Sequence, residues 1–185
     1  MTDAAPDLPS PDDVPSMLRS ALGQIDFARN YTVALLDATP KELWHEVPPN
    51  SPTSIAWQIG HLTVSQYGLL MFRVRGRQPD DLDLIPGKFR KAFGRGSDPA
   101  AIGEQTASPD ELLERFGRVH QQAMTELHAL LDAPDVAEQL LEPVDMPYAA
   151  YPVKLGAILF CPLHEQIHSG QIGLTRRLLD LDPVR

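Results

Sequence analysis

Hydrophobic residues recur three and four positions apart in four long segments of the chain, and stretches rich in proline and glycine separate these segments. Side chains at that spacing lie on one face of an α-helix, so the pattern predicts amphipathic helices. No segment shows the alternation of apolar and polar residues that is typical of a strand. The predicted helices cover residues 16–36, 53–75, 108–134 and 155–179. We therefore predict an all-α fold, a four-helix bundle.

Capping residues mark the start of two helices. Residues 108–111 begin with serine and proline and end with glutamate, which supplies an N-cap, a pre-set first helical residue and a reciprocal cap. Residues 39–42 repeat this pattern with threonine as the cap. The repeat predicts a further short helix through Trp44.

The rest of the chain divides into an arm and a long connection. Residues 1–15 are rich in proline and aspartate, which cannot hold a helix interior, so we expect a mobile N-terminal arm. Residues 16–185 then form one bundle domain, as the length allows. Residues 76–107 show neither the helical nor the strand spacing of apolar residues, and they contain several glycines and prolines. We expect them to cross over the surface or the end of the bundle, between the second and third helices.

Charge and composition narrow the choice of partners and compartment. The chain has 25 acidic and 16 basic side chains, and a net charge of -9 would repel a phosphate backbone, so we expect no nucleic acid partner. The first residues lack a secretory signal and no apolar run approaches about 18 residues, so we expect a cytoplasmic protein without a membrane partner. The single cysteine, Cys161, excludes an internal disulfide.

The only concentrated basic stretch lies in the long connection. It alternates with Phe89 and Phe93, and a solvated loop is favoured over an anion-binding patch, because short charge runs usually face water. Its members are Lys88, Arg90, Lys91 and Arg95.

Three histidines are the candidate metal ligands. His164 and His168 are four residues apart on the last predicted helix, so both rings lie on one face and can bind one ion. The alternative is a pair of hydrogen-bonded histidines in the core or on the surface. His61 lies in the middle of the apolar second helix. Three candidates from two facing helices favour a metal site, since bundle cores commonly build such sites.

Residues 164–168 also fit the HExxH pattern of zinc proteases, with Glu165 as general base. Proteases with that pattern take their third protein ligand from further along the chain. The stretch after His168 contains neither histidine nor glutamate. We therefore disfavour a protease.

Three segments resemble the DinB/YfiT-like family of bacterial four-helix metalloenzymes. Residues 54–62 resemble the family's signature on the second helix, residues 164–171 its signature on the last helix, and residues 93–97 the crossover of some members. The resemblance covers residues 17–179. It implies an up-down-down-up bundle, a three-histidine divalent metal site with open positions, and a homodimer.

One residue departs from the family's pattern. Pro162 lies inside the last predicted helix, two residues before His164, where it removes a backbone donor. Either a kink there or a helix that begins at Pro162 would shift His164 relative to His168.

A three-histidine site leaves a tetrahedral ion with an open position, which is the arrangement of catalytic sites. A metal there lowers the pKa of bound water toward about 7 and deprotonates a thiol, so hydrolysis and thiol transfer both stay open. Zinc is favoured by its availability, with nickel next. The resemblance implies the same two chemistries, because relatives include bacillithiol transferases and mycothiol-dependent maleylpyruvate isomerases. Arg73, Arg75 and the basic stretch could receive a substrate carboxylate.

Three kinds of function therefore stay open. The first is a metal-dependent enzyme acting on a small molecule, either a hydrolase or a low-molecular-weight-thiol transferase, with its catalytic base unassigned. The second is a non-catalytic protein that binds a metal or a small ligand. The third is a structural dimerisation module.

Other polar and aromatic residues near the histidines receive plainer interpretations. Gln171 either orients a ligand or bonds between helices, and Glu165 is favoured as a supporting or solvated residue. Cys161 is favoured as a small buried thiol. The remaining residues are interpreted as ordinary histidines or core aromatics: His45, His120, His128, Trp57 and Tyr67.

Overall fold

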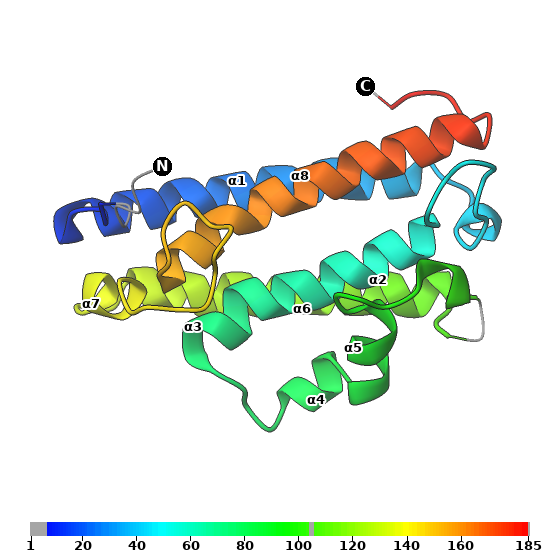
Figure 1. The fold of residues 1–185 in the computed structure, drawn as a ribbon. Helices are drawn as coiled ribbons and strands as arrows, with labels where there is room; N and C mark the ends of the chain where they lie inside the picture. Colours follow the sequence, from blue (N-terminus) through cyan, green and yellow to red (C-terminus); the bar gives the residue numbers. More distant parts are fainter. Residues whose placement is uncertain (1–6, 104–105, 185) are drawn as a thin grey trace.

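The computed structural model describes residues 7–103 and 106–184, and this part of the chain is all-α, without a strand. The prediction of an all-α fold is confirmed. Four long helical segments lie within a few residues of their predicted positions (Figure 1). They are α1 (Val14–Asp37), α2 (Ile55–Gln66) with its continuation to Arg75, α6 (Pro109–Leu131) and α8 (Lys154–Leu178).

The second long segment is not a uniform α-helix. After α2 it widens into a π-helical stretch, Tyr67–Phe72, and returns to an α-helical turn in α3 (Arg73–Arg75). Such stretches are rare and often lie at functional sites. Here the stretch directly follows the part of α2 that carries His61.

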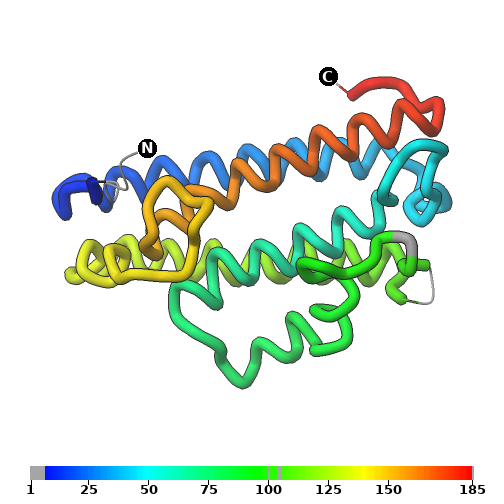
Figure 2. The backbone as a smooth tube through the Cα atoms, in the orientation of Figure 1, coloured from blue at the N-terminus to red at the C-terminus, as the bar shows by residue number. Residues whose placement is uncertain are grey.

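The long helices pack in two pairs. α1 lies alongside α8, and α2 lies alongside α6 (Figures 1 and 2). The first turns of α1 and α8 lie at one end of the molecule, while α2 and α6 begin at the other end (Figure 2). α2 also contacts α8, which brings the predicted metal ligands onto neighbouring helices.

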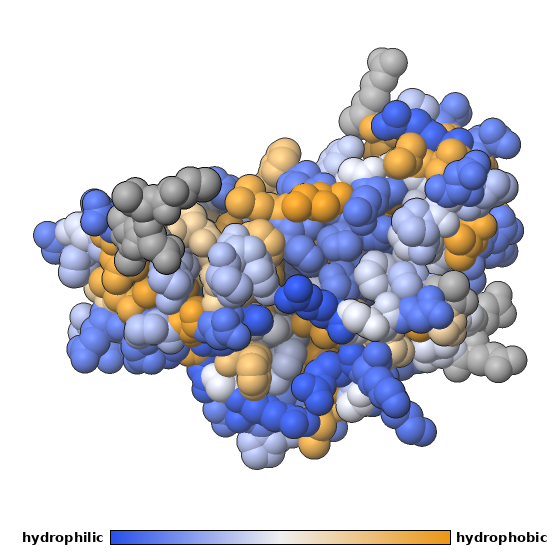
Figure 3. All heavy atoms as spheres, viewed as in Figure 1, coloured by the Kyte–Doolittle hydropathy of each residue, from blue (hydrophilic) through white to orange (hydrophobic). Residues whose placement is uncertain are grey.

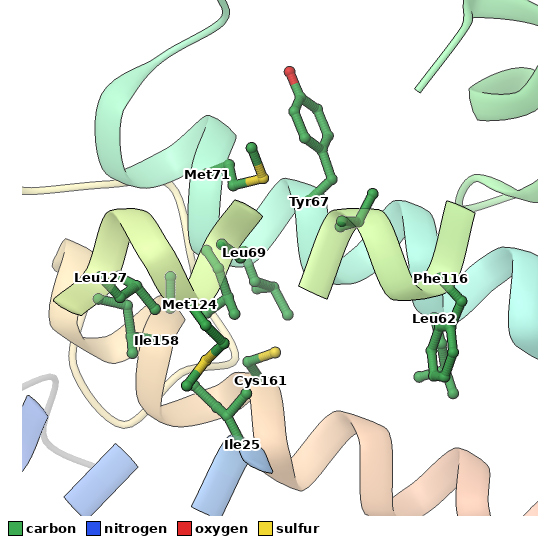
Figure 4. Close-up of a cluster of buried hydrophobic side chains, with 14 of the residues drawn as sticks. Ile25, Leu62, Tyr67, Leu69, Met71, Phe116, Met124, Leu127, Ile158 and Cys161 are labelled. Atoms are coloured by element: carbon green, nitrogen blue, oxygen red, sulfur yellow. The ribbon is translucent and has the colours of Figure 1, made fainter. Parts of the chain in front are cut away.

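Apolar side chains from all four long segments form the core. Figure 4 shows buried side chains from each of them, among which are Ile25 of α1, Leu62 of α2, Phe116 of α6 and Ile158 of α8. Each of the four is at most 2% exposed. Burying a side chain of this size stabilises the fold by about 1.5–3 kcal/mol.

The helix starts agree with the capping patterns in one case and disagree in the other. The Ser108 hydroxyl accepts the backbone N–H of Glu111, as predicted. The predicted threonine cap is wrong, because the Thr39 hydroxyl donates to the Leu35 carbonyl in the last turn of α1. Only a 3-10 turn, Lys41–Leu43, follows it.

The connection between the second and third long segments contains short helices that the hydrophobic pattern did not predict. They are α4 (Asp81–Leu84), α5 (Gly87–Phe93) and a 3-10 turn, Pro99–Ala101. α5 packs against α2, where the Phe93 ring lies beside Gly60, and both Phe89 and Phe93 are buried. The basic side chains around these two phenylalanines are exposed, as expected.

Asp81 ties this connection to the bundle. Its carboxylate accepts two hydrogen bonds from Arg75, at 2.7 and 2.9 Å, and one from the Tyr67 hydroxyl, at 2.9 Å. The hydrogen bonds from Arg75 lower the pKa of Asp81 to about 2. Arg75 also donates to Glu126 of α6. It is therefore paired in the structure, which argues against its predicted use as a carboxylate receptor.

The ends of the described chain complete the bundle. Residues 1–6 of the expected N-terminal arm lie outside the described residues, and a 3-10 turn, Pro11–Asp13, leads directly into α1. A short helix, α7 (Val136–Leu140), follows α6. α8 begins well before Pro162 and continues through it. No helix within the described ranges combines the length and the hydropathy that a membrane span requires.

Candidate metal centre

The structure brings the three predicted ligands together. His61 comes from α2, and His164 and His168 come from successive turns of α8. One ring nitrogen from each residue lies within 4.8 Å of the other two. Zinc binds imidazole nitrogens at about 2.0–2.1 Å, so an ion at the centre would draw the three rings toward one another. The cluster could hold a metal ion.

His61 is oriented by the crossover. Its Nδ1 lies 2.9 Å from the backbone carbonyl of Phe93, an acceptor only, so Nδ1 must carry the proton and donate. Nε2 then carries the lone pair, which accepts a hydrogen bond from the Ser65 hydroxyl at 3.3 Å. The Trp57 ring stacks on the imidazole at 4.7 Å and nearly parallel to it. These contacts fix both the tautomer and the ring plane.

The crossover reaches His61 because α2 has a glycine at position 60. A Cβ on Gly60 would lie 2.2 Å from the ring of Phe93. Four residues further along, the Ser97 hydroxyl accepts the indole N–H of Trp57 at 3.0 Å. Residues 93–97 are thus held on α2 at both ends.

His168 is oriented by Gln58, one turn before His61 on α2. Its Nδ1 donates to the Gln58 side-chain carbonyl oxygen, which leaves Nε2 free to bind a metal. Gln58 is fully buried, and its amide nitrogen has no partner among the described residues. A histidine ligand whose second nitrogen donates to a fixed acceptor is the usual arrangement at metal sites.

His164 is held less tightly than the other two. No hydrogen bond to its ring is found within the described part of the chain, and it packs near Phe160 at 5.8 Å between ring centroids. Its ring centroid lies 4.6 Å from that of His168 and 5.4 Å from that of His61. Pro162 therefore does not remove His164 from the cluster.

Burial keeps the three imidazoles neutral. It lowers the pKa of His164 to about 4 and that of His168 to about 3, with a further lowering from the neighbouring histidines. Burial also lowers the pKa of His61, although the hydrogen bond to Phe93 opposes it. Neutral imidazole is the form that binds metals.

A cavity of about 520 Å³ opens beside His61 and His164. Its apolar wall is formed by Val64, Leu69 and Phe160. The polar groups that line the cavity come from the second helical segment, the crossover and the loop before α8: Ser65, Arg73, Arg95 and Tyr148. The volume suits a small molecule.

Glu165 lies in a different environment from its histidine neighbours. It is 2% exposed and accepts two hydrogen bonds from Arg29 of α1, at 2.9 and 3.2 Å. Arg29 also donates to the Gln66 side-chain oxygen and to the Phe116 carbonyl. Glu165 is therefore neither solvated nor placed as the general base of an HExxH site.

Sequence reasoning missed this network, although one signal for it was present. Arg29 directly follows Ala28 on the buried face of α1, where a charged side chain requires a partner. His120, interpreted as ordinary, belongs to the same network: its Nδ1 accepts from Gln66, and its Nε2 lies 3.3 Å from an Asp26 oxygen. Burial and the charge of Arg29 lower its pKa.

The remaining candidates near the site have defined places. Burial raises the pKa of the Cys161 thiol, and Cys161 is outside the cluster of possible ligands. Gln171 is exposed, and its side chain opposes the lowering of the His168 pKa by burial. Trp57 packs on His61. Tyr67 is buried, as expected for a core aromatic, and its ring points away from the other labelled side chains of Figure 4, so that its hydroxyl donates to Asp81.

Comparison with known families identifies most of the chain. The sequence model of the DinB superfamily matches residues 24–172, a range that contains all three histidines. A search of curated proteins gives no match to this chain.

Proposed function

The chain belongs to the DinB superfamily, and from this premise we propose that it is a metal-dependent enzyme that acts on a small molecule, as a hydrolase or a low-molecular-weight-thiol transferase. One observation carries the proposal. Three neutral imidazoles converge beside a cavity of about 520 Å³. The Nδ1 atoms of His61 and His168 donate to fixed acceptors, which leaves their Nε2 atoms directed at the cluster.

The residues fit a divalent transition metal, for which zinc is the first choice and nickel the second. His61, His164 and His168 would hold it through neutral nitrogens. A metal held by three histidines supplies a Lewis acid that makes a water or a thiol more acidic. The Phe93 carbonyl and Gln58 keep two of the rings in their binding tautomer, and Trp57 shields one face of His61 from water.

Metal analysis of protein purified without a nickel resin tests the proposal. We expect about one zinc or nickel ion per chain, and loss of the ion in His61→Ala but not in the matched control His128→Ala on α6. Metal-loaded protein is then assayed with ester, amide and thiol-conjugate substrates. Turnover that disappears on chelation supports the enzyme, and a chain that takes up no metal contradicts it.

A second candidate is a non-catalytic protein that binds a metal or a small ligand. It is favoured by the absence of a carboxylate among the described residues that line the cavity, since a general base is often a carboxylate. Tight ligand binding without turnover across the same substrates would select this candidate.

The partners and the topology are also proposals. We propose an up-down-down-up bundle in the cytoplasm, without nucleic acid or membrane partners, in which residues 16–185 form one domain.

We further propose a homodimer, supported by apolar side chains along the outer side of α8, where Figure 3 shows hydrophobic surface. Leu163, Ile167 and Leu174 are 60%, 57% and 54% exposed. Sedimentation of the wild type and of Ile167→Glu tests this.

A further inference from the structure

The cavity beside the histidines is positively charged, although the chain as a whole carries a net charge of -9. Two arginines, Arg73 and Arg95, line it together with His61 and His164. No aspartate or glutamate is among the described residues that line it. In a partly enclosed site with apolar walls, such charges act through a low dielectric and concentrate anions.

Arg73 is oriented but not saturated. One of its guanidinium nitrogens donates to the Gly68 carbonyl at 2.8 Å, in the π-helical stretch. Within the described part of the chain this is its single hydrogen bond, and it has no ion pair. Arg75, two residues later, differs completely because Asp81 and Glu126 occupy its donors. Arg73 therefore keeps donors for a ligand.

Arg95 stands on a fixed backbone at the rim of the same cavity. It lies between Gly94 and Gly96, and the positive φ of Gly96, 83°, favours glycine there. The flanking Phe93 and Ser97 are both bonded to α2, as described above. Among the described residues no acidic side chain pairs with the exposed Arg95 guanidinium.

A second cavity, of about 1050 Å³, adjoins the first and shares Arg95 and Val64 with it. Lys88, Arg90 and Lys91 line this second cavity, with Asp98 as the acidic residue among the described lining. The basic stretch thus extends the positive field outward from Arg95, so that an anion approaching the histidines passes along basic side chains.

We propose that the cavity beside the histidines binds a small carboxylate substrate, with its carboxylate on Arg95 and Arg73 and its apolar part on Val64, Leu69 and Phe160. This assignment rests on the proposed function, because it takes the histidines as the reaction centre. A planar guanidinium matches a carboxylate in bidentate geometry. The apolar residues that line the same cavity favour an acid with an aryl or alkyl chain.

Calorimetric titration with two probes tests the assignment. The full-length chain, with and without zinc, is titrated with 4-phenylbutyrate and with its neutral amide. We expect the carboxylate to bind at least about tenfold more tightly than the amide, both with and without zinc. Hydrogen bonds between charged groups contribute more to affinity than those between neutral groups. Arg95→Gln and Arg73→Gln are each expected to remove most of this preference. Arg19→Gln, an exposed site on α1 with the same loss of charge, is expected to retain it.

The outcomes separate this assignment from the metal site. Equal affinity for the two probes, no binding of the carboxylate, or an unchanged preference in Arg95→Gln overturns the carboxylate site, even if zinc binds normally. Failure to bind zinc, with the preference intact, overturns the proposed function and leaves the carboxylate site standing. If Arg73→Gln does not fold, the exposed Arg95→Gln decides.

Discussion

Two polar clusters lie on different sides of α8, and they differ in how fully their hydrogen-bonding groups are used. On one side, Arg29 and Glu165 are almost completely buried, and each nitrogen of the guanidinium has an acceptor. On the other side, His164 and His168 each present a ring nitrogen to the same point as His61, and His164 lines the cavity without a hydrogen bond to its ring among the described residues.

Residues 164–168 thus contain both a structural group, Glu165, and the two candidate ligands, His164 and His168. A saturated network fixes how α8 sits against α1 and α6, because any rotation breaks several charged hydrogen bonds. The histidine cluster instead holds three lone pairs that converge on one point, where an added ligand can use them. Buried polar groups alone therefore do not identify a functional site. Lone pairs that converge beside a cavity do.

The largest effect is expected when the saturated network is broken. Arg29→Met leaves the Glu165 carboxylate buried and unpaired, which should reduce the free energy of unfolding by about 3–5 kcal/mol in a urea titration. The double variant Arg29→Met/Glu165→Leu should recover most of the loss. Lys41→Met, which breaks the exposed pair with Asp110, is the control and should cost less than about 1 kcal/mol. A double variant as unstable as the single one would contradict this role.

Removal of the neighbouring histidine should act on the metal instead. His164→Ala is expected to weaken zinc binding by more than about 100-fold, the upper range for losing an outer partner of a ligand. The metal-free chain should change in stability by about 1 kcal/mol or less, because no hydrogen bond to this ring is found among the described residues. Competition with a chromophoric chelator measures the affinity. An unchanged affinity would exclude His164 as a ligand.

Gly60→Ala should disturb the histidine cluster through packing alone. Its new methyl group would lie 2.2 Å from the Phe93 ring, which should cost about 1–3 kcal/mol and displace the carbonyl that orients His61. Gly117→Ala on α6 is the control, since nothing lies within 4 Å of its Cβ. The control should gain about 0.5–1 kcal/mol in thermal unfolding. Equal behaviour of the two variants would show that Phe93 is not seated on Gly60.

Gln58→Met should weaken the metal site with little effect on folding. Loss of the acceptor for His168 is expected to reduce zinc affinity by about tenfold. Stability should change by about 1 kcal/mol or less, because the substitution also removes a buried amide nitrogen that has no described partner. Zinc titrations of this variant and of the exposed control Gln122→Met measure the difference. A loss of stability without a loss of affinity would reverse the assignment.

The smallest effect is expected from pH near neutrality. Histidines of the unfolded chain bind protons below about pH 6.5, whereas His164 and His168 in the folded chain do so only near 4 and 3. Protons therefore favour the unfolded chain, and the stability of metal-free protein is lost as the pH falls from about 6.5 toward 3. Urea titrations at about pH 7.5, 6.5 and 5.5 should show the decline beginning. His164→Asn should show a shallower decline, and stability that rises on acidification would contradict the lowered pKa values.

The sequence predicts the long helices well because their pattern is local. On α1 the apolar period identifies buried residues such as Leu18 and Ile25. On α8 the period identifies the helix but not its core side, since Leu163 and Ile167 are exposed while Glu165 is buried. A helix with two apolar stripes does not reveal which one faces inward. α4 and α5 are too short to show a period.

The site is predictable only in part for a related reason. His164 and His168 are recognisable because four residues separate them on one helix, and His61 because it interrupts an apolar helix. Their supports have no such signal: Gln58 meets His168 across 110 positions of sequence, and Phe93 acts through its backbone carbonyl, which every residue has. The pairing of Arg75 with Asp81 likewise depends on the fold of the crossover.

The π-helical stretch determines which side chain of the second helical segment, Phe72 or Arg73, faces the cavity. In an uninterrupted α-helix, at about 100° per residue, the residue eleven positions after His61 returns to within about 20° of its direction. That residue is Phe72. A π-helical turn takes up one extra residue, so Arg73 reaches the cavity while Phe72 is 49% exposed. Deleting a single residue between 67 and 72 would place Arg73 eleven positions after His61, so an uninterrupted α-helix would still present this cation to the cavity. The π-helical stretch thus accommodates an inserted residue that the cation-bearing wall can lose without changing its charge.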